Sequence, residues 1–261
     1  MWGLSFVAQS EGASIGTFTF NGLRTLLGGI VLVPLVAFSH KKENSKLPAG
    51  EKKNFAFKDV LIGGLCCGIP LFIGGNLQQE AFKYLYVGKV GFITALYMII
   101  VPLFGIFLKR KLKINIWVGV GLGVVGLYFL SIKPGDFSIG KGEFVTILCS
   151  IAFAAHILVI DHFCRKVDNI ALSCAQFFVA GILSVICMFI FEEPRMNDIM
   201  SAWLPLAYAG IGSCGIAFTA QIFGQKYTNP TVASVLLCLE SVFSVIFGWL
   251  LLDQKLDSRG F

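Results

Sequence analysis

The chain has 261 residues, of which 56% are hydrophobic and only 14% are charged, and its mean hydropathy is +0.79. Soluble domains carry about 25% charged residues, so this composition excludes an ordinary soluble protein and indicates an integral membrane protein. The net charge of +6 does not indicate a nucleic-acid partner, because the Lys and Arg residues lie mainly in short segments between apolar runs, where they orient membrane spans.

Eight apolar runs of the sequence are each long enough to cross a bilayer as a helix, which takes about 20 residues. A shorter apolar fragment, residues 2–10, precedes them and would extend roughly 13 Å as a helix, too little to cross alone. The sequence therefore predicts an all-α integral membrane protein whose first helix is partial. In chain order, the predicted spans are 15–38, 59–80, 87–108, 114–132, 143–163, 170–191, 203–225 and 230–252.

The longest segment between spans, residues 39–58, carries six Lys residues and is predicted to be cytoplasmic, because segments rich in Lys and Arg stay on that side of the membrane. This assignment also places every other loop. Thirteen of the 21 Lys and Arg residues then lie in cytoplasmic loops and six on the opposite side, which is consistent with a single topology. Lys89, three residues into its span, is expected to extend its long side chain to the outer surface.

An internal repeat is visible when residues 73–108 are compared with the sequence 143 positions later. Eight positions are identical, including Gln78 with Gln221 and Tyr84 with Tyr227. Self-similarity at a fixed interval is typical of a chain built from repeated units.

The charges of the loops support the same repeat. A unit of five spans is odd, so its two copies would enter the membrane from opposite sides and their matching loops would differ in charge. The segment after residue 108 has four basic residues and no acid, whereas the segment after residue 252 has two of each. We therefore predict inverted five-helix repeats at 1–132 and 133–261, with no tenth helix closing the second.

Two charged residues lie deep inside predicted spans. Glu240 is roughly 12 Å into the apolar run 232–252, and Arg24 is roughly 14 Å into its own span. A charge near the bilayer centre costs between about 2.5 and 17 kcal/mol, so each should face a partner or a watery cavity. Two interpretations follow: a structural ion pair that holds helices together, or a site that binds a solute or a coupling ion.

Neighbouring positions supply further candidates for this site. Asn21 shares a helical face with Arg24, and Ser244 shares one with Glu240. Tyr97 is the counterpart of Glu240 under the 143-residue interval, so both copies would place a hydrogen-bonding group at the same depth. This symmetry favours a site at the interface of the repeats.

Three aromatic side chains complete the candidate set. His156 is the one imidazole in the middle of a span, and it is interpreted either as a hydrogen-bonded helix contact or as a proton relay. Trp2 would lie deep in the membrane if the first helix were completed, and Trp2 and Phe6 are candidates for lining a pocket.

The sequence lacks the common motifs of metal-dependent enzymes. It has no HExxH and no cluster of Asp residues for magnesium. The stretch "GLGVVG" at 121–126 matches a dinucleotide-binding pattern, but it lies in the middle of a span, where Gly119 and Gly123 instead predict close helix packing. We expect no enzyme activity, no cofactor and no bound metal.

Four stretches resemble the drug/metabolite transporter superfamily, in particular its EamA-type branch: "WGLSFVAQ" at 2–9, "FTFNGLRTLLGGIVLVPL" at 18–35, "GKVGFITALYMIIVPLFGIFL" at 88–108 and "LESVFSVIFGWLLLDQKL" at 239–256. The resemblance covers essentially the whole chain. It implies ten helices in two inverted repeats around a central cavity, with Arg24, Asn21, Tyr97 and Glu240 near its walls. This sequence departs from that pattern in half of the first helix and all of the tenth.

The leading hypothesis is a secondary transporter in a bacterial plasma membrane that moves a small metabolite, such as an amino acid or a drug-like compound, by alternating access. Export is the direction that the resemblance implies. Glu240 would contact a cationic group of the solute or carry a coupling proton, and Arg24 would hold Glu240 in the resting state or bind an anionic group. The alternatives are a lipid-modifying membrane enzyme and a non-transporting helical scaffold. The oligomeric state is left open.

Overall fold

The computed structural model describes residues 1–45, 56–107, 114–131 and 140–254, and every regular element in these ranges is helical. Two elements depart from α-helical geometry, a short 3₁₀ segment, η1, and a π-helical stretch, η2. In chain order the elements are α1 (Trp2–Glu11), η1 (Gly12–Ile15), α2 (Thr17–Asn44), α3 (Phe57–Ala81), α4 (Val87–Thr94), α5 (Tyr97–Phe107), α6 (Ile114–Ser131), α7 (Lys141–Phe163), α8 (Asn169–Phe191), α9 (Met196–Ser201), α10 (Trp203–Ala207), η2 (Tyr208–Phe218), α11 (Thr219–Tyr227), α12 (Pro230–Leu237) and α13 (Leu239–Leu252).

Seven helical segments of the described residues are long and apolar enough to cross a membrane, which makes this a multi-pass membrane protein. They coincide with seven of the eight predicted spans. The remaining predicted span, 114–132, corresponds to α6, and the side chains of its last six residues lie outside the described part of the chain. The seven segments are Thr17–Lys41, Phe57–Ala81, Val87–Phe107, Lys141–Phe163, Asn169–Phe191, Trp203–Tyr227 and Pro230–Leu252.

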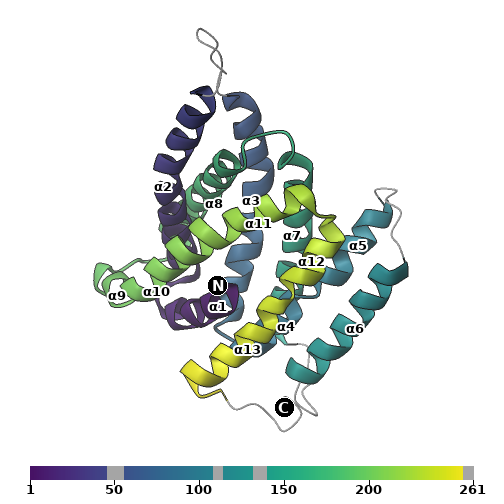
Figure 1. Cartoon of the computed structure of the whole chain (residues 1–261). Coiled ribbons are helices and arrows are strands. Elements are labelled where there is room, and N and C mark those ends of the chain that lie inside the picture. Colours follow the sequence, from purple (N-terminus) through teal and green to yellow (C-terminus); the bar gives the residue numbers. More distant parts are fainter. Residues whose placement is uncertain (46–55, 108–113, 132–139, 255–261) are drawn as a thin grey trace.

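The helices pack around the centre of the molecule (Figure 1). Helix α3 packs against α7 and α8, and α8 also packs against α2, whereas α10 to α13 run diagonally across the front of the view. The short α1 does not cross the molecule; it packs against α13 and η2 near the centre. The predicted cytoplasmic segment 39–58 joins α2 to α3, and its residues 46–55 lie outside the described residues.

Two of the apolar spans are broken at matching positions. The break between α4 and α5 follows Thr94, and the break between α12 and α13 follows Leu237, 143 residues later. Both ends of α4 and α12 differ by this same interval. The backbone tightens alike at both breaks, because Met98 N–H donates to Ala95 O at 3.0 Å and Ser241 N–H donates to Cys238 O at 3.0 Å. Each pair is three residues apart, as in a 3₁₀ turn.

Small residues allow some helices to approach closely, though not where the sequence predicted it. A Cβ atom added at Gly28 in α2 would lie 2.5 Å from Cys214 Cβ in η2, so only glycine fits this contact. In contrast, a Cβ at Gly119 in α6 would meet none of the described residues within 4 Å. The prediction of close packing at Gly119 is therefore wrong, and its proposed partner Gly123 has no described side chain.

Candidate functional site

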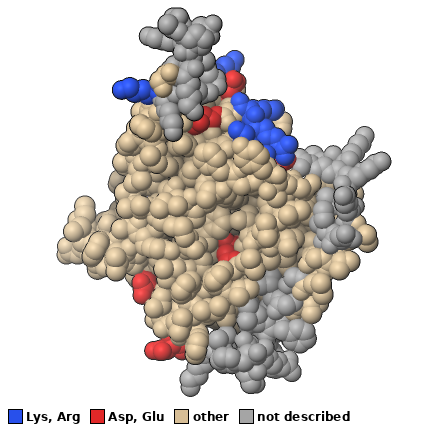
Figure 2. Space-filling model, viewed as in Figure 1, with Lys and Arg blue, Asp and Glu red and all other residues tan. Residues whose placement is uncertain are grey.

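A cavity of about 40 Å³, or about 500 Å³ when the space open to solvent at its mouth is counted, is lined by residues of α1, α2, α3, α5, α7, η2, α11, α12 and α13. Figure 2 shows the molecule hollowed near the centre of one face, with an acidic side chain inside the hollow. The lining combines charged, amide and aromatic groups, as in pockets that bind small amphipathic molecules. Its main members are Arg24, Glu240, Gln9, Gln78, Gln221, Trp2, Phe6, Tyr97, Phe153, His156 and Phe218.

Glu240 reaches the cavity because of the break before α13. It is the second residue of that helix, it lines the cavity and it is partly exposed. The Tyr97 hydroxyl donates to Glu240 Oε1 at 2.8 Å. Tyr97 is the first residue after the break between α4 and α5, and it is only 3% exposed. The broken span α4–α5 thus contacts the broken span α12–α13 through Tyr97 and Glu240, which lie just after the two breaks.

Arg24 enters the cavity from α2 and is 5% exposed. Its Nε donates to Asn21 Oδ1 at 2.9 Å, and Asn21 Nδ2 donates to Ser184 Oγ in α8 at 3.2 Å. The guanidinium also lies 5.8 Å from the centre of the Phe20 ring, close enough for a cation–π contact. These contacts hold the Arg24 side chain without neutralising its charge.

Arg24 and Glu240 line the same cavity but form no ion pair, and within the described residues no acid lies within 4 Å of the Arg24 guanidinium. The prediction that Arg24 holds the Glu240 carboxylate at rest is wrong for this structure. Each charge is instead held by a neutral hydrogen-bonding residue, Asn21 or Tyr97. Both charges therefore remain available to a third molecule.

An aromatic wall lies beside the two charges. The ring of Trp2 meets that of Phe218 edge to face, with centres 5.0 Å apart. His156 lies at the edges of Phe153 and Phe218, with ring centres 6.4 and 6.0 Å apart. His156 Nε2 lies 2.9 Å from Gln176 Oε1, so the imidazole takes part in a hydrogen bond between α7 and α8 while also lining the cavity.

The structure brings together six of the eight residues predicted for the site: Trp2, Phe6, Arg24, Tyr97, His156 and Glu240 all line the cavity. Asn21 does not line the cavity, but its side-chain oxygen accepts a hydrogen bond from Arg24. Ser244 is fully buried, and its hydroxyl donates to Ser241 O at 2.8 Å, against Gly91 of α4. Ser244 therefore lies in a helix contact away from the cavity.

One further charged residue differs from its prediction. Lys89 is 5% exposed and does not reach the surface; its Nζ forms an ion pair with Glu143 Oε1 at 2.7 Å. The other oxygen of Glu143 accepts the backbone N–H of Gly140 at 2.9 Å, at the start of α7. The pair fastens α4 to the beginning of α7.

Sequence reasoning did not select the amide side chains of the cavity, although a signal for two of them was present. Gln78 and Gln221 are identical positions of the internal repeat, and both line the cavity. Tyr97 and Glu240 are a second pair at the same interval. Phe153 and Phe218 gave no such signal, because phenylalanine is frequent throughout the sequence. Within the described residues, no group of three or more His, Cys, Asp or Glu side chains could hold a metal ion.

A bundle of membrane-spanning helices around an amphipathic cavity with accessible opposite charges is the architecture of a membrane transporter for small solutes. Comparison with known proteins supports the assignment as a transporter. The chain belongs to the EamA-like transporter family, whose model matches residues 1–132 and 140–261. This family is part of the drug/metabolite transporter superfamily.

Curated relatives are named as transporters. An "Uncharacterized transporter" of Archaeoglobus fulgidus is 28% identical over 98% of this chain and 76% of its own length. The "Aromatic amino acid exporter YddG" of Ancylobacter novellus is 25% identical over 64% of this chain and 59% of its own length. A solved crystal structure with a TM-score of 0.76 is 21% identical, covers 99% of this chain and 86% of the other, and supports the fold.

Proposed function

We propose that this protein is a secondary transporter of small amphipathic metabolites that carry both an ammonium group and a carboxylate, such as an aromatic amino acid. One observation carries the proposal: Glu240 and Arg24 line one cavity without pairing with each other. Two unpaired opposite charges in one membrane cavity are costly unless a ligand or water compensates them. A zwitterion compensates both at once.

The contacts of each residue suggest its role. The ammonium group of the solute would bind the Glu240 carboxylate, beside the Tyr97 hydroxyl. The carboxylate would bind the Arg24 guanidinium, whose hydrogen bond within the described residues uses Nε, leaving the two terminal nitrogens for a bidentate contact. The apolar part would pack on Trp2 and Phe218.

Alternating access of two inverted repeats, residues 1–132 and 133–261, would move the solute across the membrane. The matching breaks of α4–α5 and α12–α13 support this arrangement, as do the two segments that the family model matches separately. The name of the Ancylobacter novellus relative supports aromatic amino acids as cargo and export as the direction. We place the protein in a bacterial plasma membrane with the Lys-rich segment 39–58 in the cytoplasm.

The energy source in this proposal is a coupling proton or ion, because the sequence contains no nucleotide-binding loop. Glu240 is the residue that would carry a proton, since it can alternate between a charged form that holds an ammonium group and a neutral form that releases it.

Counterflow of labelled amino acids in proteoliposomes tests the proposal. Labelled phenylalanine should exchange without chemical change, and Glu240→Gln should reduce the rate at least tenfold. Glu193→Gln is a matched control, because Glu193 is exposed and does not line the cavity. Full exchange by Glu240→Gln would reject the site, and a chemically altered product would indicate an enzyme.

A further inference from the structure

A second hollow lies on the outside of the bundle and is lined by residues of α2, α3 and α8. It has a volume of about 970 Å³ including its open side, and apolar side chains make up most of its lining. Ile73 is 44% exposed and Phe191 is 70% exposed, so this side of the spans meets the acyl chains of the bilayer. The apolar lining residues are Phe18, Phe72, Ile73, Leu77, Cys187 and Phe191.

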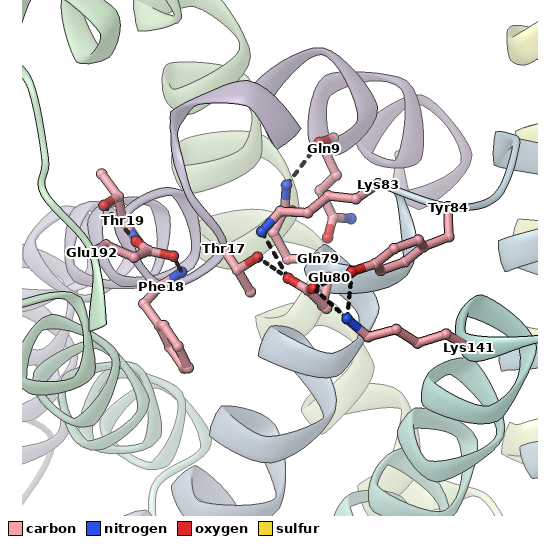
Figure 3. Close-up of polar contacts among 10 residues, drawn as sticks. All are labelled: Gln9, Thr17, Phe18, Thr19, Gln79, Glu80, Lys83, Tyr84, Lys141 and Glu192. Carbon is pink, nitrogen blue, oxygen red and sulfur yellow. Dashed lines mark hydrogen bonds and ion pairs between the residues drawn. The ribbon is translucent and has the colours of Figure 1, made fainter. Parts of the chain in front are cut away.

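One end of this groove is polar and carries a cluster of charges, which Figure 3 shows converging on Glu80. Glu80 and Thr17 line the groove at the end of α3 and the start of α2. Glu80 Oε2 accepts from the Thr17 hydroxyl at 2.7 Å and lies 2.7 Å from Lys83 Nζ. Lys141 Nζ, at the start of α7, lies 4.0 Å from Glu80 Oε1 and donates to the Tyr84 hydroxyl at 2.6 Å.

Among the described residues, the cluster has one more positive than negative charge. Lys83 and Lys141 contribute two, Glu80 removes one, and the side chains of the two lysines are 36% and 67% exposed. A lysine ammonium has three donors, and each of these lysines directs only some of them to Glu80 or Tyr84. Donors therefore remain for an anion that approaches from the membrane surface.

The nearby Glu192 does not cancel this charge. Its two oxygens accept the backbone N–H of Phe18 at 2.9 Å, the N–H of Thr19 at 2.8 Å and the Thr19 hydroxyl at 2.7 Å. Its carboxylate thus compensates the positive N-terminal end of α2. Figure 3 shows it on the opposite side of Thr17 from Lys141.

We propose that this groove binds a phospholipid with an anionic headgroup, with one acyl chain along the apolar lining and the phosphate at Lys83 and Lys141. The apolar length of the groove excludes a free phosphate as the natural occupant, because such an ion would leave the hydrophobic surface uncovered. The excess positive charge selects against a choline headgroup, whose cation would be repelled. This site does not depend on the cargo of the central cavity.

The lipid would connect elements that are far apart in the sequence. Lys83 follows α3, whereas Lys141 begins α7, and the groove itself is formed by α2, α3 and α8. A headgroup on both lysines would stabilise the contact between these helices. Lipid binding should therefore raise the thermal stability of the conformation described here.

Native mass spectrometry of the purified full chain tests the proposal directly. The chain is titrated with phosphatidylglycerol and, separately, with phosphatidylcholine of the same acyl chains. Phosphatidylglycerol should bind more tightly, and Lys83→Gln and Lys141→Gln should each weaken it about fivefold, as expected for one lysine at an anionic membrane surface. Lys226→Gln is the matched control, because Lys226 is an exposed lysine at the end of α11, away from the groove.

A second pair of variants tests the acyl-chain part of the site. Ile73→Trp should fill the groove and weaken the binding of both lipids, whereas Ile69→Trp, one turn earlier on α3 and similarly exposed at 47%, should not. If the variants melt at the same temperature as the unsubstituted protein in the absence of lipid, they are correctly folded. Equal binding of the two lipids, or displacement of phosphatidylglycerol by millimolar glycerol phosphate alone, would overturn the proposal.

Discussion

The Tyr97 hydroxyl donates a 2.8 Å hydrogen bond to Glu240, and these two residues are 143 positions apart in the sequence. The same interval relates α4 to α12 and the backbone bonds at the two helix breaks. Equivalent positions of a two-fold repeat touch each other only near its axis. The Tyr97–Glu240 bond therefore marks where the axis of the proposed repeat would pass, inside the cavity.

Replacing Tyr97 with Phe removes the hydroxyl and keeps the ring. Hydrogen bonds to a charged group contribute about 1.5–3 kcal/mol, so the partner carboxylate loses a large part of its stabilisation. In counterflow, Tyr97→Phe should lower transport about tenfold or more. Tyr227→Phe, which removes the hydroxyl of a side chain that is 82% exposed and does not line the cavity, should leave transport intact. Equal rates in the two variants would contradict a role for the Tyr97 hydroxyl.

Replacing Arg24 with Met should separate the recognition of the carboxylate from that of the rest of the solute. Binding of phenylalanine should weaken about tenfold to 100-fold, because a charge-assisted contact is lost. Binding of phenethylamine, which lacks the carboxylate, should not weaken. Competition against labelled phenylalanine in detergent measures both. If both compounds lose affinity equally, Arg24 supports the cavity rather than contacting the solute.

Gly28 and Gly119 offer a matched test of helix packing. Gly28→Val places side-chain atoms into Cys214 of η2, which should cost about 1–3 kcal/mol of stability. Gly119→Val extends into open space on α6 and should leave the melting temperature within a degree or two. Thermal unfolding in one detergent compares them. A larger loss at Gly119 would mean that α6 packs more tightly than described.

The Lys89–Glu143 pair can be tested by a double-mutant cycle. Lys89→Met leaves a mostly buried carboxylate without its ammonium partner and should cost about 3–5 kcal/mol. Adding Glu143→Gln to Lys89→Met removes the uncompensated charge and should recover part of the loss. Strictly additive losses, measured by chemical or thermal unfolding, would show that the two side chains do not interact.

The membrane class and the position of the spans could be predicted from the sequence, because length and hydropathy belong to a single helix and need no knowledge of its neighbours. The 143-residue interval could also be read from identities such as Gln78 with Gln221. It identified Tyr97 as the counterpart of Glu240 at the same depth; that the two side chains contact each other was found only in the structure.

Which side chains meet was decided only by the tertiary structure. Membrane helices are apolar on most sides, so their sequences carry little information about which face packs inward. Depth left open whether Arg24 and Glu240 form an ion pair or a binding site, and it suggested that Lys89 reaches the surface. In the structure Arg24 contacts Asn21, and Lys89 is buried against Glu143. Ion pairing depends on the direction of side chains from separate helices, and only the packing of the whole bundle determines that direction.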